Sequence, residues 1–200
     1  MLVIGVTGGT GAGKTTFSDA VIRHGGTAID CDVLYAELLR SDSQMKEKLS
    51  RSFGDIFRPD GTLDRKILAR VVFSSEEQMK KLNEIVFEHI LRAVDAEIAK
   101  AKEKKTPYFV IDAINLVQSG LAQRCDTVVG VLAPREERLK RIIERDKLQK
   151  PEAEARINAQ EPDGFYAKNC SYLLKNTGGE TEFSLAAERL FEQIIKECNA

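Results

Sequence analysis

A glycine-rich stretch near the beginning of the chain ends in a lysine and a threonine, two residues suited to phosphate chemistry. It runs Gly8-Gly9-Thr10-Gly11-Ala12-Gly13-Lys14-Thr15 and fits the pattern G-x-x-x-x-G-K-[ST] of phosphate-binding loops. Glycines let successive backbone N–H groups point at one phosphate, and the N-terminus of a following helix adds partial positive charge. We therefore expect Lys14 to bridge the terminal phosphates of a nucleotide and the Thr15 hydroxyl to bind Mg²⁺.

The elements around this stretch favour that interpretation over an ordinary glycine-rich turn. Residues 2–6 form a short apolar run typical of a buried strand, and residues 16–24 have the pattern of a helix. Phosphate-binding loops of this kind connect a strand to a helix in the same order. The sequence therefore predicts a strand, a phosphate-binding loop and a helix at the start of the fold.

Acidic residues follow two further predicted strands. Asp30 and Asp32 come after an apolar run at 27–29, and Asp112 follows a run at 108–111. In open α/β sheets, ligands bind beyond the carboxyl ends of the strands, so these carboxylates and the loop are expected to face one cleft. Asp32 is predicted to be a base or positioning group for an attacking hydroxyl, and Asp112 to meet the Mg²⁺ shell. The alternative role for Asp32 and Asp112 is helix capping.

A predicted helix over residues 135–147 carries Arg138, Arg141 and Arg145, the last two on one face because they are four residues apart. Two interpretations are open. In one, the arginines lie on a solvated face and pair with nearby glutamates. In the other, this helix and a second one at 149–160 form a lid that closes over the triphosphate and neutralises charge developing during transfer.

The composition limits the class of protein and its partners. The 200 residues suit one α/β domain, and 30 basic against 31 acidic side chains leave no overall charge to attract nucleic acid or an anionic membrane. The four cysteines form no C-x-x-C pair, and the two histidines are not arranged with them as a zinc site. We find neither a leader pattern nor an apolar run of roughly 18 residues, so we expect a cytoplasmic protein without membrane or nucleic-acid partners.

The predicted elements together have the order of an α/β P-loop NTPase fold, like that of nucleoside-phosphate kinases. We expect a five-stranded parallel sheet flanked by helices, with one helix between the third and fourth strands, a helical substrate insertion and a helical lid. The chain would form a single P-loop kinase domain. Its core would comprise residues 1–35, 106–145 and 168–200, the insertion about 36–105 and the lid about 145–167.

The sequence also resembles the dephospho-coenzyme A kinase family over nearly its whole length. The resemblance rests on segments that occur in the family's order, namely Thr7 to Thr16, Ile29-Asp30-Cys31-Asp32, Gly61-Thr62-Leu63-Asp64-Arg65 with Val72-Phe73, Arg141 to Asp146, Ala159-Gln160 and Leu173-Leu174-Lys175-Asn176. It implies transfer of the γ-phosphoryl group of ATP to the ribose 3′-hydroxyl of dephospho-CoA, with Mg²⁺ as cofactor. It is compatible with a monomer or a weak homo-oligomer.

The motifs and the resemblance together predict roles for individual residues. Asp32, Lys14 and Arg145 would be catalytic. ATP would be bound by Gly9, Thr10, Gly11, Ala12, Gly13, Lys14, Thr15, Thr16, Arg141 and Arg145. Dephospho-CoA would be bound by Asp30, Asp32, Arg65 and Asn115, and Mg²⁺ by Thr15 and Asp112.

Several positions depart from the family's usual residues, mostly on the substrate side. Phe87-Glu88 stand in place of His-Pro, Ile114-Asn115-Leu116-Val117-Gln118 in place of Pro-Leu-Leu-x-Glu, Arg138 in place of Gln, and Cys170-Ser171 in place of Ala-Asp. Two alternatives therefore stay open: a related P-loop kinase for another nucleoside-like hydroxyl, and an ATP-binding regulatory protein without transfer. The presence of Asp30, Asp32 and the arginines together with Lys14 argues against the second, since a pure binder needs no base.

Overall fold

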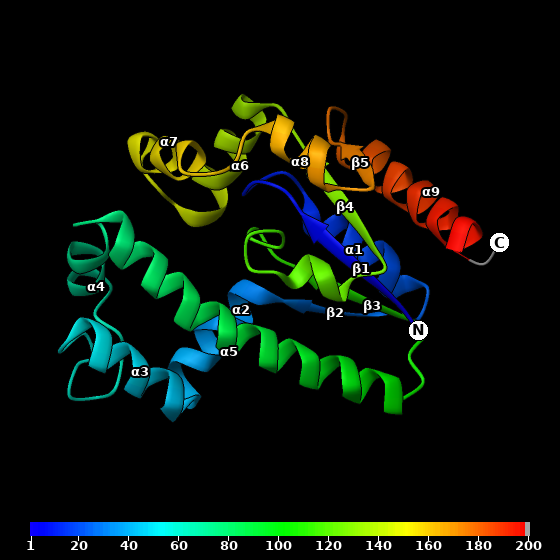
Figure 1. Cartoon of the computed structure of the whole chain (residues 1–200). Coiled ribbons are helices and arrows are strands. Elements are labelled where there is room, and N and C mark those ends of the chain that lie inside the picture. Colours follow the sequence, from blue (N-terminus) through cyan, green and yellow to red (C-terminus); the bar gives the residue numbers. More distant parts are fainter. Residues whose placement is uncertain (199–200) are drawn as a thin grey trace. The chain divides into compact units, whose positions relative to one another are not determined.

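The computed structural model describes residues 1–198 and contains a five-stranded sheet with helices packed against it (Figure 1). The strands are β1 (Leu2–Thr7), β2 (Thr27–Asp30), β3 (Tyr108–Asp112), β4 (Thr127–Leu132) and β5 (Tyr172–Lys175), in the order β2-β3-β1-β4-β5. β1 pairs in parallel with both β3 and β4, and β4 pairs in parallel with β5. The strand that leads into the glycine-rich loop is therefore the central one, with both edges hydrogen-bonded.

The chain divides into two compact units, which we describe separately. Unit 1 comprises Met1–Ile29 and Ala101–Ala200, and unit 2 comprises Asp30–Lys100. The helices of unit 1 are α1 (Lys14–Arg23), the 3-10 helix η1 (Leu121–Arg124), α6 (Arg135–Asp146), α7 (Lys150–Asn158), α8 (Asp163–Asn169) and α9 (Glu180–Cys198).

One face of the sheet is covered by α1 and α9, and this layer forms the main core of unit 1. Ile4 and Val6 of β1 have no exposed surface, and they belong to one apolar cluster with Phe17 of α1 and Phe191 of α9. The two phenylalanine rings pack edge to face with centroids 6.4 Å apart. Burial of side chains of this size stabilises a fold by about 1.5–3 kcal/mol each. The core therefore fixes the position of α1, the helix that begins at the end of the loop.

The opposite face of β1 is covered by the segment between β3 and β4, which packs very closely. A Cβ atom at Gly5 would lie 2.6 Å from Leu116 Cδ2 and 2.8 Å from Cys125 Sγ. Only glycine fits there without displacing these side chains. The segment holds turns and the short η1. The predicted helix between the third and fourth strands is therefore wrong.

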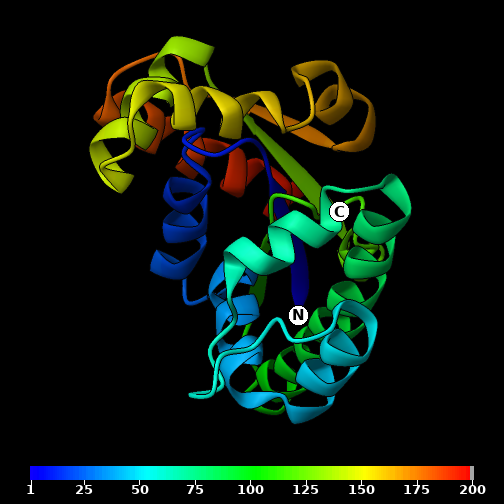
Figure 2. The same ribbon diagram turned by 90° about the vertical axis from the view of Figure 1, so that its left-hand side faces the viewer.

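Three helices lie between β4 and β5 in unit 1, namely α6, α7 and α8. Figure 2 shows these helices in yellow-green to orange, and α6 contacts the loop before α1, where Arg141 Nη1 donates to the carbonyl of Gly11. α6 and α7 pack through a small apolar cluster that includes Leu139, Ile142 and Ile157. The sequence predicted two helices here, and the third, α8, adds Tyr166 to the buried residues of the unit.

Unit 2 is helical, with α2 (Cys31–Ser41), α3 (Ser43–Phe53), α4 (Arg65–Val72) and most of α5 (Glu76–Glu103). Aspartate side chains cap the first three helices: Asp30 accepts from two N–H groups of α2, Asp42 from Met45 of α3, and Asp64 from two N–H groups of α4. Each cap satisfies N–H groups that have no partner inside the helix and is typically worth about 1 kcal/mol. Asp30, the residue joining the two units, is thus the cap of α2, and the capping alternative for Asp32 is wrong.

Candidate active site

The glycine-rich loop joins the end of β1 to the start of α1, as predicted. Three of its glycines, Gly8, Gly11 and Gly13, have φ values of 141°, 79° and 104°. These values lie in the region where side chains with a Cβ are strained, so the loop needs glycine at these positions. No side chain caps α1, and its first turn holds no acidic residue. The first N–H groups of the helix are therefore open to an anion, which the helix dipole favours.

Four successive carbonyl groups of the loop accept hydrogen bonds within the protein. The carbonyl of Gly9 accepts from the N–H of Ala12 at 3.1 Å. Those of the next three residues accept from side chains: Thr10 from Arg138 Nε at 3.0 Å, Gly11 from Arg141 Nη1 at 3.1 Å, and Ala12 from Asn176 Nδ2 at 2.9 Å. These hydrogen bonds hold the backbone of the loop in one conformation.

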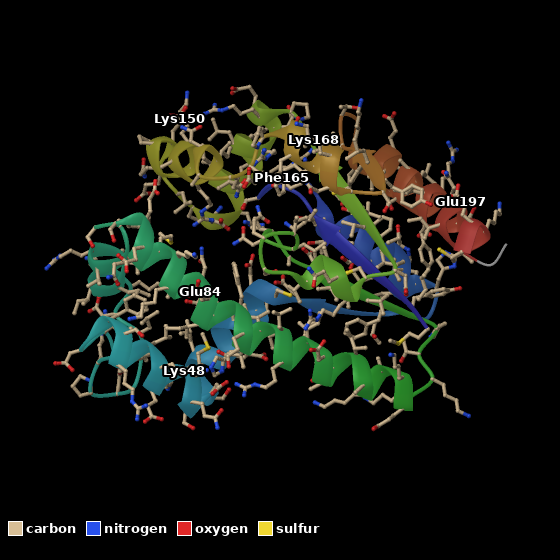
Figure 3. The ribbon with its side chains drawn as sticks, viewed as in Figure 1. Lys48, Glu84, Lys150, Phe165, Lys168 and Glu197 are labelled. Carbon is tan, nitrogen blue, oxygen red and sulfur yellow. The ribbon has the colours of Figure 1, made fainter. Side chains whose placement is uncertain are left out.

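A glutamine from the segment after α7 holds the loop at a further point. Gln160 Oε1 accepts from the backbone N–H of Thr10 at 3.0 Å, and Gln160 Nε2 donates to the Thr10 hydroxyl at 2.6 Å. Figure 3 labels Lys150 on α7 and Phe165 and Lys168 on α8, the two helices between which this segment lies. The loop conformation therefore depends on residues about 130 to 165 positions away in the sequence.

A lysine and an aspartate meet beside the loop. Lys14 Nζ lies 3.8 Å from Asp112 Oδ1, and both side chains are nearly buried, with 13% and 12% of their surface exposed. Asp112 is the last residue of β3 and pairs in register with Val6 of β1. The parallel sheet thus brings together two predicted site residues that are far apart in the sequence.

A cavity of about 470 Å³ opens at the N-terminal end of α1. Its lining includes Gly13, Lys14 and Thr15 from the loop and the first turn, and Arg141 and Arg145 from α6. Glu144 also lines it, so the cavity is not purely basic. The positive charges of Lys14, Arg141 and Arg145 and the N-terminus of α1 complement the negative charge of a nucleotide's phosphates.

The three arginines of α6 occupy different environments. Arg138 is 7% exposed, so the solvated-face interpretation is wrong for this residue. Arg141 is half-buried against the carbonyl of Gly11. Arg145 is 62% exposed and contacts Asp146, with its Nε 2.7 Å from the carboxylate. Arg145 is therefore acid-paired and also lines the cavity, and its part in a lid stays a prediction.

The donors near the loop fit Mg²⁺ better than a metal with many protein ligands. No group of three His, Cys, Asp or Glu side chains within residues 1–198 could hold a metal ion. Mg²⁺ is usually held by one or two protein oxygens together with phosphate oxygens and waters. The exposed Thr15 hydroxyl and the carboxylate of Asp112 are two such oxygens.

The predicted residues that bind the acceptor fall in different parts of the chain. Asp30 and Asp32 are exposed at the start of α2, and Arg65 is exposed at the start of α4, all within unit 2. The positive charge of Arg65 acts on Tyr35, whose pKa is nevertheless raised because burial outweighs it. Asn115 is exposed in the turns after β3. It belongs to unit 1, as the glycine-rich loop does, whereas the other three residues belong to unit 2.

Arg138, Gln160 and Asn176 hold the loop, a role that was predicted for none of them, although Arg138 was one of the arginines of the lid interpretation. Gln160 and Asn176 do stand in two of the segments on which the family resemblance rests, and that was the available signal. Across the described part of the chain, no helix has the length and apolar character needed to cross a membrane.

Comparison with known proteins agrees with this geometry. The sequence model of the family described as Dephospho-CoA kinase matches residues 2–182. A dephospho-CoA kinase of Geobacter metallireducens is 35% identical over 198 residues, which cover 98% of each chain. A crystal structure from Thermus thermophilus is 31% identical with a TM-score of 0.80, covering 98% of this chain and 97% of that one.

The fold is shared more widely. A dephospho-CoA kinase from Campylobacter jejuni superposes with a TM-score of 0.68 at 24% identity over 98% of both chains. The predicted five-stranded parallel sheet flanked by helices is confirmed. The match over nine-tenths of the sequence shows that the chain belongs to the dephospho-CoA kinase family.

Proposed function

We propose that this protein transfers the γ-phosphoryl group of ATP to the ribose 3′-hydroxyl of dephospho-CoA, giving coenzyme A. The observation that carries the proposal is that Arg138, Arg141 and Asn176 hold three loop carbonyls by hydrogen bonds, beside a cavity at the N-terminus of α1. The loop, Lys14 and Thr15 line this cavity together with Arg141 and Arg145. Membership of the dephospho-CoA kinase family supports the choice of substrates.

Residues of unit 1 would bind ATP and stabilise the charge that moves during transfer. The stretch Gly9 to Thr16 would hold the β- and γ-phosphates through backbone N–H groups other than those of Thr10, Ala12 and Thr16, which donate within the protein, and Lys14 would bridge the two phosphates. Arg141 and Arg145 would lie over the phosphates, and Arg145 would exchange its contact with Asp146 for one with the transferred group. Preorganised cations of this kind are commonly worth several kcal/mol in the transition state.

Mg²⁺ would be held by the Thr15 hydroxyl and Asp112, since both are oxygen donors beside the loop. When bound, the ion supplies charge neutralisation on the β- and γ-phosphates. Lys14 also contacts Asp112, so the lysine would help to hold this carboxylate in place.

Asp32 would accept the proton of the ribose hydroxyl. A ribose hydroxyl is a weak nucleophile at neutral pH, and its proton is lost late in a loose phosphoryl-transfer transition state. Asp30 uses its Oδ1 to accept from the N–H groups of Asp32 and Val33, at 2.8 and 3.1 Å. The cap therefore fixes the backbone from which Asp32 projects. Asp30, Arg65 and Asn115 would contact dephospho-CoA.

The cellular setting is also part of the proposal. Cys31, Cys125, Cys170 and Cys198 are all free thiols, which suits the reducing cytoplasm. The near-neutral net charge supports small-molecule substrates rather than nucleic acid. We propose a monomer or a weak homo-oligomer.

An acceptor screen tests this function. ATP consumption by the purified protein is followed with dephospho-CoA, adenosine, other nucleosides and no acceptor. We expect dephospho-CoA to give the largest acceleration over the rate without acceptor. Equal slow hydrolysis in all samples would contradict transfer, and acceleration by another hydroxyl compound alone would keep a kinase but refute the acceptor.

A further inference from the structure

Arg138 is a buried cation that the proposed transfer leaves without a chemical role. Its Nε donates to the carbonyl of Thr10 at 3.0 Å, and its Nη2 donates to Gln160 Oε1 in a short contact. Both acceptors are neutral. A neutral amide could make hydrogen bonds of this kind, so the contacts alone do not explain why a full charge is placed there.

The charge of Arg138 has no carboxylate partner within residues 1–198, where its contacts are the two neutral acceptors. Burial lowers the pKa of the guanidinium, Tyr166 and Asp163 act in the opposite direction, and Arg135 adds to the lowering. Arginine nevertheless stays protonated in proteins. Asp163 forms no ion pair with this buried charge and offsets only part of the cost of burial, since the pKa is lowered overall, so the unliganded site is electrostatically incomplete.

The position of the guanidinium points to the missing counter-ion. A Cβ atom at Gly9 would collide with Arg138 Nη2, and the Nε of the same side chain bonds the next residue, Thr10. The guanidinium therefore lies against the loop backbone at Gly9 and Thr10. A phosphate in the cavity lined by Gly11, Gly13 and Lys14 would be separated from Arg138 by the loop backbone.

We propose that the phosphate chain of the nucleotide is the counter-ion of Arg138, which acts across the loop as a positioning residue and raises affinity for phosphates. The inference rests on the proposed function, because it requires a nucleotide at the loop. Charges separated by one layer of backbone interact far more strongly than they would in water, since the intervening region has a low dielectric constant.

This role and a purely structural role, in which Arg138 only ties the loop to α6, predict opposite effects on the stability of the unliganded protein. A tie stabilises the protein whether or not nucleotide is present, so removing it lowers the melting temperature of the unliganded protein. Removing a buried charge that lacks a counter-ion has the opposite effect: the melting temperature of the unliganded protein stays the same or rises, because the unfavourable burial of that charge is removed. Stability would then be lost only in the complex with nucleotide.

The experiment compares three variants with the unmodified protein. Arg138→Gln removes the charge but keeps an N–H donor, and Arg138→Lys keeps the charge but loses the planar fork. Arg135→Gln makes the same charge change three residues earlier on α6, where the side chain is 46% exposed. Isothermal titration measures binding of ATP, inorganic tripolyphosphate and adenosine, and calorimetry measures melting of each unliganded protein.

We expect Arg138→Gln to weaken binding of ATP and tripolyphosphate by about tenfold and to leave adenosine affinity within about twofold. Its unliganded melting temperature should be unchanged or higher. Arg138→Lys should keep phosphate affinity within about threefold, and Arg135→Gln should have little effect on any ligand.

Any of three results would overturn the inference: a lower unliganded melting temperature with unchanged phosphate affinity, an equal loss for adenosine, or an equal loss in Arg138→Lys. If the unmodified protein itself fails to bind ATP and tripolyphosphate, the proposed function fails as well. If it binds them and Arg138→Gln binds them equally, only the role of Arg138 fails.

Discussion

Asn176 offers a direct test of the claim that side chains distant in sequence hold the loop. The residue is 6% exposed, and its Nδ2 donates to the carbonyl of Ala12 at 2.9 Å. Asn176→Ala leaves that carbonyl, on a residue with 1% exposure, without its donor. An unsatisfied buried acceptor costs about 1–3 kcal/mol, so we expect a loss of that size in the free energy of unfolding.

The chain supplies a matched control. Asn169 also donates from Nδ2 to a backbone carbonyl, that of Phe165 at 2.8 Å, but it is exposed. Asn169→Ala should therefore change the free energy of unfolding by no more than about 0.5 kcal/mol. Urea unfolding followed by circular dichroism measures both variants under the same conditions.

The same substitution should appear in ATP binding. In Asn176→Ala the loop would relax in the free protein and would have to re-form around the phosphates. Part of the lost stabilisation would then appear as weaker ATP affinity, by tenfold for each 1.4 kcal/mol or so. Asn169→Ala should bind ATP normally. Equal effects of the two variants on stability, together with unchanged ATP affinity in both, would refute the idea that Asn176 holds the loop.

Three further predictions concern the chemistry of the site and the thiols. Lys14→Ala should lower turnover by a hundredfold or more, on the order expected for loss of a preorganised cation, while circular dichroism shows an intact fold; near-normal turnover would exclude transfer at this loop. Asp32→Asn should greatly reduce turnover with little change in ATP affinity by titration, because Asp30 supplies the cap of α2; equal losses in both would assign Asp32 to nucleotide binding instead. Burial raises the pKa of Cys125 to about 12 and that of Cys170 to about 11, so at pH 8 both stay protonated thiols. Iodoacetamide should then modify the exposed Cys198 first, and fast labelling of Cys125 would contradict its burial.

The sequence predicted the parts of the fold that local patterns determine. The glycine positions of the loop, the strand before it and the helix after it follow from residue type and spacing over about 20 residues. The helix between the third and fourth strands was wrong because packing decides that segment. Leu116 and Leu121 are buried there, with 0% and 1% exposure, and Leu116 lies directly beneath Gly5.

The contacts that hold the loop could not be predicted in the same way. Arg138 bonds a carbonyl 128 positions away, and no periodicity in its helix distinguishes it from an exposed arginine. Likewise, the choice between Asp30 and Asp32 as helix cap depends on a boundary that sequence patterns place only to within one or two residues. Tertiary structure settles both questions.

The identity of the product tests the account most directly. ATP labelled in its γ-phosphoryl group is incubated with the protein and dephospho-CoA, and the labelled product is examined by phosphorus NMR for coupling to the ribose H3′ proton. We predict transfer of the label to the 3′-oxygen of dephospho-CoA and none to an analogue that lacks the 3′-hydroxyl. Label on another oxygen, or its release as inorganic phosphate at the same rate with and without dephospho-CoA, would contradict the proposed function.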